Sequence, residues 1–286
     1  MTIPEYNTIT VSIIIPCYNQ GVFLLDALQS LEALDKNMVE IIIVNDGSTD
    51  QFTNEYIGAL DKGKYKVVVQ QNKGLAAARN TAIKIAKGKY IIPLDADNKL
   101  HPVFIMDAIG ILDQAENVTV VYGNARYFGA KNGDWIVGEY NLQKLMIENY
   151  IDACAMIRKE ALIAEGLYDE NMRYMGWEDW ELWLRLSFKG YQFSYVNKVF
   201  FDYRVLDTSM SNSMFKSFKN YEKPNFLVNY LQGKYPDQLG LQWMVKHVTG
   251  RFRKNPVLFI IKLFLQTYMP KTFNQLLKKN KIRIGL

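Results

Sequence analysis

Two aspartates, Asp95 and Asp97, directly follow an apolar segment, Tyr90–Leu94, whose pattern predicts a buried strand. Residues two apart on a strand point to the same side of a sheet, so we expect the two carboxylates to converge. Like charges held together raise each other's pKa, and a divalent cation removes that cost. Carboxylates suit Mg²⁺ or Mn²⁺, and Mg²⁺ is often shared with substrate phosphates. The pair therefore predicts a site for a metal ion and a diphosphate.

The elements before this pair alternate between strands and helices. Apolar runs predict strands at Val11–Ile15, Glu40–Val44, Lys66–Val69 and Tyr90–Leu94. Helical spacing predicts helices at Gly21–Leu34, Gln51–Leu60 and Gly74–Ala86, with Asp50 as an N-cap and Gly88 as a stop. Strands that are apolar throughout are typical of a parallel sheet covered by helices on both faces, so the fold class is α/β.

Polar residues follow three of these strands. They occupy Pro16–Asn19, Asn45–Ser48 and Asp95–Asp97. Ligands of such sheets bind beyond the carboxyl ends of the strands. We therefore expect the three polar segments to meet in one crevice.

The pattern changes beyond residue 100. It predicts a helix at His101–Ala115, strand or hairpin pieces at Val118–Tyr122, Tyr127–Phe128 and Trp135–Val137, helices at Ile157–Glu165 and Glu178–Lys189, and a strand at Tyr191–Tyr203. No motif marks the segment between Tyr122 and Ala155, and we expect the residues that shape the substrate pocket there.

Five motifs occur in a fixed order along the chain. They are Val11–Asn19, Ile43–Asp50, Asn72–Gly74 with Ala78–Asn80, Asp95–Asp97, and Trp177–Trp183. In this order they resemble the motifs of the family 2 glycosyltransferases over about residues 9–215. The resemblance implies a GT-A (Rossmann-like) fold, with a mostly parallel sheet flanked by helices. It divides the chain into a nucleotide-sugar-binding half, 1–100, an acceptor-binding and catalytic half, 101–215, and a helical basic C-terminal region, 216–286.

The resemblance also implies how the donor, a UDP-sugar, is bound. Asp46 accepts a hydrogen bond from the base N3–H, and Pro16 and Tyr18 frame the ring. Asp97 binds Mn²⁺ or Mg²⁺, and Asp95 lies nearer the ribose and the water of the metal. The other donor-binding residues that it implies are Asn19, Asn72, Gly74, Arg79 and Arg204. Two simpler interpretations stay open: Asp46 as a turn residue and Arg79 as an exposed helix residue.

Asp179 is the catalytic base that the resemblance implies. Transfer with inversion requires a base on the face opposite the leaving group, and apolar neighbours raise a carboxylate's pKa toward a useful value. Trp177, Glu178 and Trp180 are the implied acceptor-binding residues, while a core position for Trp180 stays open.

One position departs from the family pattern. Tyr203 stands where a histidine often completes the coordination of the metal, which leaves the third protein ligand open. The two histidines of the chain, His101 and His247, fit no ligand spacing.

The composition bounds the class of protein. The chain has 286 residues, of which 49% are hydrophobic and 22% charged, which is typical of a globular protein. Cys17 and Cys154 show neither zinc spacing nor a disulfide framework, which indicates reduced thiols in the cytoplasm. We find no signal peptide and no apolar run long enough to span a membrane.

The charges are segregated along the chain. Gln238–Leu286 has ten basic residues and no acidic one, which leaves 24 basic and 29 acidic residues in Met1–Asp237, a net charge of −5. The apolar stretch Pro256–Pro270 lies among these basic residues and suits an interfacial helix on an anionic membrane, at its cytoplasmic face. Packing against the enzyme's own core or a homodimer partner stays open. Nucleic acid is disfavoured, because large aliphatic residues separate the basic ones.

The sequence thus predicts an inverting glycosyltransferase. We expect it to move a sugar from a UDP-sugar to a hydroxyl of a saccharide acceptor, lipid-linked and part of surface polysaccharide or glycoconjugate synthesis. One alternative is a sugar nucleotidyltransferase, but Pro16–Gly21 lacks the Gly-rich triphosphate loop that this reaction needs. The other is a non-catalytic nucleotide- or glycan-binding module, against which Asp95, Asp97 and Asp179 argue.

Overall fold

The computed structural model describes residues 9–206, 222–240 and isolated positions between 257 and 272. The chain forms two compact units. The first comprises Met1–Leu145 and Asn149–Leu206, and the second comprises Met146–Glu148 and Asp207–Leu286. The two halves predicted to meet at residue 100 both lie largely in the first unit.

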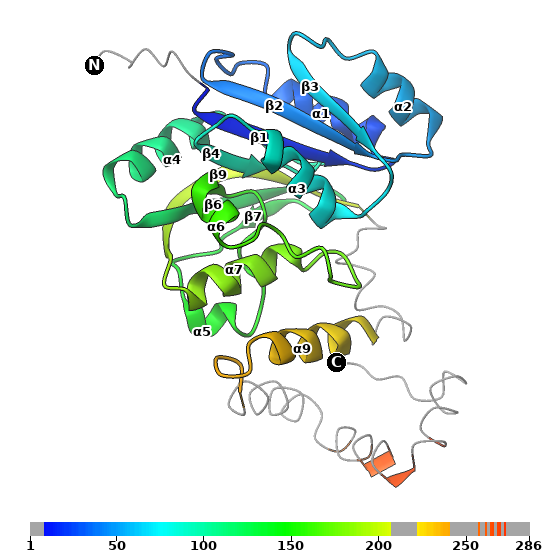
Figure 1. The fold of residues 1–286 in the computed structure, drawn as a ribbon, viewed down its shortest axis with the longest axis vertical. Coiled ribbons are helices and arrows are strands. Elements are labelled where there is room, and N and C mark those ends of the chain that lie inside the picture. The colour runs from blue at the N-terminus through cyan, green and yellow to red at the C-terminus, as the bar shows by residue number, and fades with distance from the viewer. Residues whose placement is uncertain are drawn as a thin grey trace. The chain divides into compact units, whose positions relative to one another are not determined.

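The described part of the first unit contains one sheet of nine strands (Figure 1). The strands are β1 (Val11–Cys17), β2 (Val39–Asp46), β3 (Tyr65–Gln70), β4 (Tyr90–Pro93), β5 (Lys99–Leu100), β6 (Val118–Gly129), β7 (Gly133–Trp135), β8 (Met156–Arg158) and β9 (Gln192–Val205). Their spatial order is β3-β2-β1-β4-β8-β6-β9-β5, with β7 paired to β6.

The first four strands in this order form the parallel half that the sequence predicts. β1 pairs in parallel with β2 and β4, and β2 pairs in parallel with β3. Beyond β4 the sheet is mixed, because β8 is antiparallel to both of its neighbours while β6 and β9 are parallel. The sheet is thus parallel through β3, β2, β1 and β4 and again between β6 and β9, with β8 as the antiparallel strand between these two parts.

Helices cover both faces of this sheet. The helices of the first unit are α1 (Gly21–Ser30), α2 (Gln51–Gly58), α3 (Leu75–Ile85), α4 (Val103–Gln114), α5 (Leu142–Leu145), α6 (Lys159–Ala164) and α7 (Glu178–Phe188). The side chain of Asp50 accepts a hydrogen bond from Thr53 N at 2.8 Å, which confirms Asp50 as the N-cap of α2.

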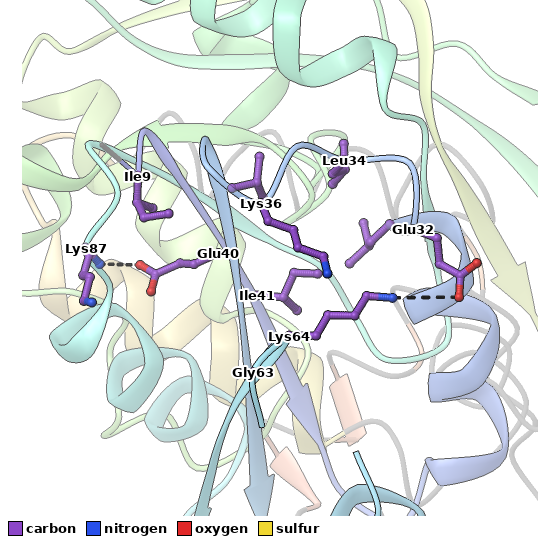
Figure 2. A pocket seen from close by; sticks show the side chains of 11 residues that line it. Ile9, Glu32, Leu34, Lys36, Glu40, Ile41, Gly63, Lys64 and Lys87 are labelled. Atoms are coloured by element: carbon purple, nitrogen blue, oxygen red, sulfur yellow. Dashed lines mark hydrogen bonds and ion pairs between the residues drawn. The ribbon is translucent and has the colours of Figure 1, made fainter. Parts of the chain in front are cut away.

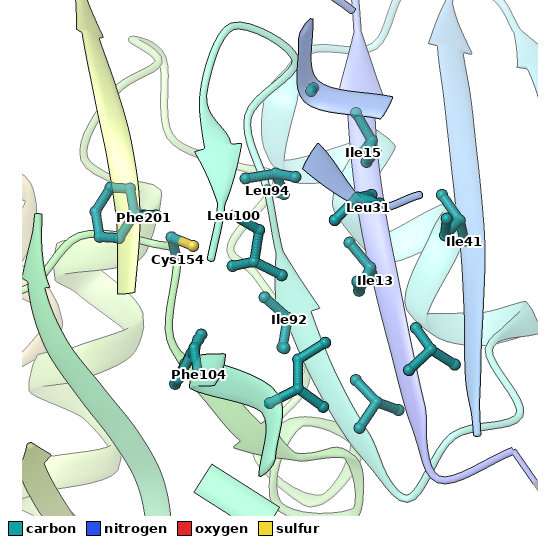
Figure 3. Packing of buried hydrophobic residues seen from close by; sticks show 14 of the residues in the cluster. Ile13, Ile15, Leu31, Ile41, Ile92, Leu94, Leu100, Phe104, Cys154 and Phe201 are labelled. Atoms are coloured by element: carbon teal, nitrogen blue, oxygen red, sulfur yellow. The ribbon is translucent and has the colours of Figure 1, made fainter. Parts of the chain in front are cut away.

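The main core lies on the α1 and α4 face of the sheet. Figure 3 shows Ile13 and Ile15 of β1 in the same buried cluster as Phe104 of α4. Ile14, between them, is also fully buried but lies outside that cluster. Because neighbouring strand residues face opposite sides, Ile14 supports the other face, which α3 covers. Each such side chain contributes about 1.5–3 kcal/mol by its burial.

Three predicted elements differ from the structure. Asp95 and Asp97 lie in a turn, with Asn98 N donating to Asp95 O at 3.0 Å, because β4 already ends at Pro93. The argument from strand alternation was therefore wrong for this pair. The helix expected from Ile157 begins at Lys159, because Ile157 belongs to β8 and pairs with both β4 and β6. A strand of three residues is too short to leave a periodic signal.

Two of the pieces expected after residue 118, Val118–Tyr122 and Tyr127–Phe128, belong to one strand, while Trp135 of the third lies in β7, which forms a hairpin with that strand. β6 runs unbroken for 12 residues, with shifts of register beside Gly123 and Asn124. A Cβ at Gly123 would lie 2.5 Å from Phe200 Cδ2, so only glycine allows the two strands to approach there. These irregularities interrupt the alternation of the sequence, which explains why it read as separate pieces.

The described part of the second unit is dominated by α9 (Glu222–Lys234). The predicted interfacial helix Pro256–Pro270 lies outside the described residues except for isolated positions, as does His247. Within the described residues, no helix combines the length and the apolar character that crossing a membrane requires.

Candidate active site

Asp46 ends β2 and organises the loop that follows β3. Its Oδ1 accepts hydrogen bonds from Gln70 Nε2 at 2.7 Å and Lys73 N at 2.9 Å, and its Oδ2 accepts one from Gly74 N at 2.8 Å. Asp46 is buried, but a carboxylate offers about four acceptor positions, so one more donor fits. Asp46 is therefore not only a turn residue, because it also holds the loop between β3 and α3 in place. Its contact with a uracil ring stays a prediction.

The polar loops after β1 and β2 are tied together by Asn19. Its Oδ1 accepts hydrogen bonds from Thr49 N at 2.8 Å and Asp50 N at 2.9 Å. Its backbone is left-handed, with φ at 54°. Asn19 therefore shapes the crevice, while the neighbouring Tyr18 is 43% exposed at the same edge and Pro16 is buried inside β1.

Gly47 lets the loop after β2 pack on the loop after β3. It has a φ of +68°, and a Cβ there would lie 2.6 Å from the backbone nitrogen of Asn72. Asn72 itself is exposed at this edge. The first two polar segments thus meet at the carboxyl edge of the sheet, as the sequence predicts.

The turn Asp95–Asn98, which we call the metal loop because a metal site is predicted there, contains the two predicted ligands in different environments. Asp95 Oδ1 accepts a hydrogen bond from Arg79 Nη2 at 2.7 Å. Burial, followed by the charge of Asp95, raises the pKa of Asp97 to about 6. Among the side chains that the structure describes, none donates a hydrogen bond to the Asp97 carboxylate, whose hydrogen-bond partner is its own backbone N–H. A cation placed beside this carboxylate would offset both the burial and the charge of Asp95.

Arg204 holds the backbone of this loop. Its Nε donates to Asp97 O at 2.9 Å, and its backbone nitrogen donates to Asn98 Oδ1 at 2.9 Å. Its Nη2 contacts Asp26 at 2.5 Å, and its guanidinium lies 4.3 Å from the ring centre of Phe128. These contacts favour a positioning function for Arg204. The predicted contact with a diphosphate stays a prediction.

The residues present fit a divalent cation held by two carboxylates. In the described part of the chain, no three acidic, histidine or cysteine side chains are arranged to hold a metal. Tyr203 packs edge-on against Tyr127 and Trp135, with ring centres 6.1 and 5.7 Å apart. His101 bonds to Asp202 at 2.9 Å. A Mn²⁺ or Mg²⁺ ion would therefore draw its remaining ligands from diphosphate oxygens and water.

Arg79 joins the metal loop to the start of α7. Its Nη2 contacts Asp95 Oδ1 and its Nη1 contacts Glu178 Oε1, each at 2.7 Å. The side chain of Arg79 is only 2% exposed, so the alternative of an exposed helix residue is wrong. The same guanidinium lies 5.3 Å from the ring centre of Tyr168. A buried arginine is tolerable only with such partners.

The carboxylate of Glu178 is occupied by contacts within the protein. Besides Arg79, its carboxylate accepts hydrogen bonds from Gly176 N at 2.7 Å and Trp177 N at 3.1 Å. Trp180 is buried and donates its indole N–H to Leu145 O at 2.6 Å. The structure thus favours a bracing function for Glu178 and a core position for Trp180 over the predicted contacts with an acceptor. Trp177, at the start of α7, is only partly buried.

Asp179 has the environment that a general base needs. Its Oδ2 accepts a hydrogen bond from Asn149 Nδ2 at 3.0 Å, and its Oδ1 accepts one from Trp180 N at 2.8 Å. Burial raises the pKa of Asp179 to about 7, with a further rise from Glu178, while Arg79 and the hydrogen bonds act in the opposite direction. A carboxyl group with a pKa near neutrality both accepts and releases a proton readily.

Two further site residues escaped the sequence motifs. One is Asn149, and the other is Asp152, whose Oδ1 accepts a hydrogen bond from Cys154 N at 2.8 Å. Burial, then Asp95, raises the pKa of Asp152 to about 8, and Asp179 adds to this rise. A signal did exist, because Asp152 is a lone acidic residue between the buried Ile151 and Ala153. Both residues lie in the interval where pocket residues were expected.

A separate pocket lies at the amino edge of the parallel strands. Figure 2 shows Glu40 and Ile41 beside Gly63 and Lys64. These residues are at the start of β2 and just before β3, whereas Asp46 is at the end of β2. The pocket is therefore separate from the carboxyl edge where the predicted site residues gather.

Comparison with known proteins identifies a family and several relatives. Residues 12–166 match the family described as Glycosyl transferase family 2. A glycosyltransferase of Rickettsia prowazekii (strain Madrid E) is 30% identical over 230 residues, which cover 74% of this chain and 69% of that protein. Chondroitin synthase of Pasteurella multocida (strain Pm70) is 31% identical over 225 residues, which cover 76% of this chain and 22% of that protein.

Solved structures show the same fold. S. aureus TarS 1–349 in complex with UDP-GlcNAc has a TM-score of 0.61 at 19% identity, over 77% of this chain and 66% of that one. A longer S. aureus TarS has a TM-score of 0.58 at 19% identity, over 79% of this chain and 44% of that one. The chain thus spans less than half of the longer TarS. The likeness confirms the predicted GT-A fold.

We expect Arg79→Leu to lower the free energy of unfolding by about 3–5 kcal/mol, because Glu178 would stay buried without its partner. Urea unfolding at neutral pH measures the change. Lys89→Ala is the matched control, since it breaks an exposed ion pair with Asp113 and should cost about 1 kcal/mol or less. Equal losses in the two variants would contradict a structural function of the Arg79 pairs.

Proposed function

The chain belongs to glycosyl transferase family 2 and is a glycosyltransferase, and on this premise we propose that it transfers a sugar, with inversion, from a UDP-sugar to a saccharide hydroxyl. The observation that carries the proposal is the pair of contacts made by Arg79. One nitrogen of its guanidinium lies 2.7 Å from the Asp95 carboxylate, and another lies 2.7 Å from the carboxylate of Glu178, which directly precedes Asp179. These contacts support a donor-phosphate site at Asp95 next to a base at Asp179.

We propose that the UDP part of the donor binds at the carboxyl edge of the sheet. Asp46 has an acceptor position left for the base, and the partly exposed ring of Tyr18 lies at the same edge. The related fold of TarS binds UDP-GlcNAc in one structure and UDP in another. We propose the same class of donor here.

Asp97 and Asp95 would hold the divalent cation. When bound, Mn²⁺ or Mg²⁺ offsets the negative charge that develops on the diphosphate of the leaving UDP. The protein contributes the geometry: Arg79 fixes Asp95, and Arg204 fixes the peptide of Asp97.

Asp179 is the proposed base. It accepts the proton of the acceptor hydroxyl while that oxygen forms a bond to the anomeric carbon of the donor sugar. The bond from that carbon to the phosphate oxygen breaks, and its electron pair leaves with UDP. Because the acceptor itself is the nucleophile, one attack inverts the anomeric centre and no covalent sugar–enzyme intermediate is needed.

The acceptor and the place of action are proposed more broadly. Chondroitin synthase, a relative that makes a polysaccharide, supports a saccharide acceptor. The basic, apolar composition of Gln238–Leu286 supports a lipid-linked acceptor met at the inner face of the cytoplasmic membrane. Pairing of two chains through this region would be the other way to cover its apolar residues.

A panel of UDP-sugars tests the donor and the metal together. We expect Mn²⁺-dependent release of UDP from at least one of them, and we expect Asp97→Ala to abolish the metal dependence of UDP binding measured by calorimetry. Asp134→Ala, in the exposed β6–β7 hairpin, is the control and should bind UDP normally. Release of pyrophosphate would identify a nucleotidyltransferase, and no product at all would indicate a binding module.

Asp179→Asn should separate binding from chemistry. The amide keeps the size of the side chain but is not a base, so transfer should fall by at least about 100-fold while the Kd for the UDP-sugar stays within about twofold. Single-turnover assays and calorimetry give the two quantities. Near-normal turnover would remove Asp179 from its assignment.

The rate of transfer should depend on pH through Asp179. The base must be ionised, and its pKa is raised to about 7, so kcat/KM should fall about tenfold per pH unit below 7 and level off above it. The pKa of Asp152 is raised to about 8, and Asp152→Asn is the control that should retain the acid limb. If Asp152→Asn removes that limb, the titrating base is Asp152 instead.

A further inference from the structure

Asn149 lies beside the proposed base on a segment that no motif marks. The segment leads to β8, and Trp183 supports it by donating its indole N–H to Ile151 O at 2.9 Å. Asn149 Nδ2 donates to Asp179 Oδ2 at 3.0 Å. Because an ionised carboxylate only accepts hydrogen bonds, the amide must present its nitrogen, and not its oxygen, to Asp179.

This orientation leaves the other end of the amide without a partner. Asn149 Oδ1 is buried, and no donor of the described residues reaches it. A buried amide oxygen without a hydrogen bond is unfavourable, and such atoms in native proteins call for an explanation. The oxygen lies on the same side chain that bonds to Asp179, so a donor reaching it would lie next to the base.

Sugar hydroxyls are donors of the required kind. The nucleophilic hydroxyl has one proton, however, and in the proposed reaction that proton goes to Asp179. If the acceptor supplies the hydrogen bond to Asn149 Oδ1, the donating group is therefore a second hydroxyl of that acceptor. Hydroxyls on adjacent carbons are spaced closely enough to reach two groups that are themselves in hydrogen-bond contact.

We propose that Asn149 forms an acceptor subsite with Asp179 and that this subsite selects a vicinal diol. One hydroxyl is deprotonated by Asp179, and its neighbour donates to Asn149 Oδ1. The amide N–H of Asn149 at the same time fixes the Asp179 carboxylate. This inference rests on the proposed function, since it assigns the acceptor of that same site.

The test compares acceptors within each enzyme variant. The probes are methyl glycosides, each paired with the deoxy analogue that lacks one hydroxyl next to the reacting one, and the variants are Asn149→Ala and Asn149→Leu. In the wild-type enzyme, loss of the neighbouring hydroxyl should lower kcat/KM about tenfold, the worth of one good hydrogen bond. In both variants the ratio should approach one.

Ratios within one variant cancel any loss of folded enzyme. Asn171→Ala, at an exposed asparagine outside the site, is the matched control and should keep the tenfold discrimination. Hydrolysis of the UDP-sugar without an acceptor should fall less in Asn149→Ala than transfer does, because water has no second hydroxyl. Discrimination that survives unchanged in both Asn149 variants overturns the proposal.

A binding measurement separates this inference from the proposed function. If the wild-type enzyme releases no UDP from any UDP-sugar, the proposed function fails. Asn149 is then judged by NMR alone, from its side-chain amide signals, which Asn149→Ala identifies. Methyl glycosides should shift those signals, and their deoxy analogues should not. No shift with any glycoside, or an equal shift with the analogues, rejects the subsite.

Discussion

The buried guanidinium of Arg79 is the contact on which the rest of the site depends. The Arg79 side chain extends from α3, and its guanidinium lies between Asp95 of the metal loop and Glu178 of α7. A buried ion pair adds little to stability compared with a well-packed apolar core, because desolvation offsets much of the attraction. Its value lies in geometry, since two carboxylates with fixed positions require a fixed cation between them.

The protein places more carboxyl groups around the Arg79 guanidinium than this one positive charge can neutralise. Asp152 and Asp179 both have raised pKa values, and each is raised partly by other carboxyl groups of the cluster. Such a site is electrostatically incomplete by itself. A metal ion with a diphosphate would complete one side of it, and proton transfer to Asp179 would relieve the other. The imbalance that costs stability is therefore the same one that makes the site receptive to the proposed reaction.

The sequence predicted the parts of the site that repeat a local pattern. Asp95, Asp97 and Asp179 sit in short motifs whose order carries the information, and the helix cap at Asp50 follows from local hydrogen bonding. The reason given for the aspartate pair was nevertheless wrong, because a turn and not a strand brings the two side chains together. A pattern of residue types can thus place two carboxylates in one loop while it leaves the backbone of that loop undecided.

What the sequence could not predict depends on contacts between distant residues. Arg79 and Glu178 are 99 positions apart, and nothing near either residue reveals that one neutralises the other. The same holds for Trp180, whose aromatic ring suits a sugar in isolation but is used in the core here. Burial decides between such alternatives, and burial is a property of the whole fold.

The two sides of the site are also built differently. On the proposed donor side, Asp46 and Asn19 hold backbone nitrogens of neighbouring loops, and Arg204 holds a backbone oxygen. Contacts to the backbone fix the shape of a loop whatever its side chains are, so this side is preorganised for one kind of ligand. On the proposed acceptor side, Asn149 reaches Asp179 through side-chain atoms alone. Side-chain contacts change with a single substitution, so recognition of the acceptor can change while the donor chemistry, fixed through the backbone, stays the same.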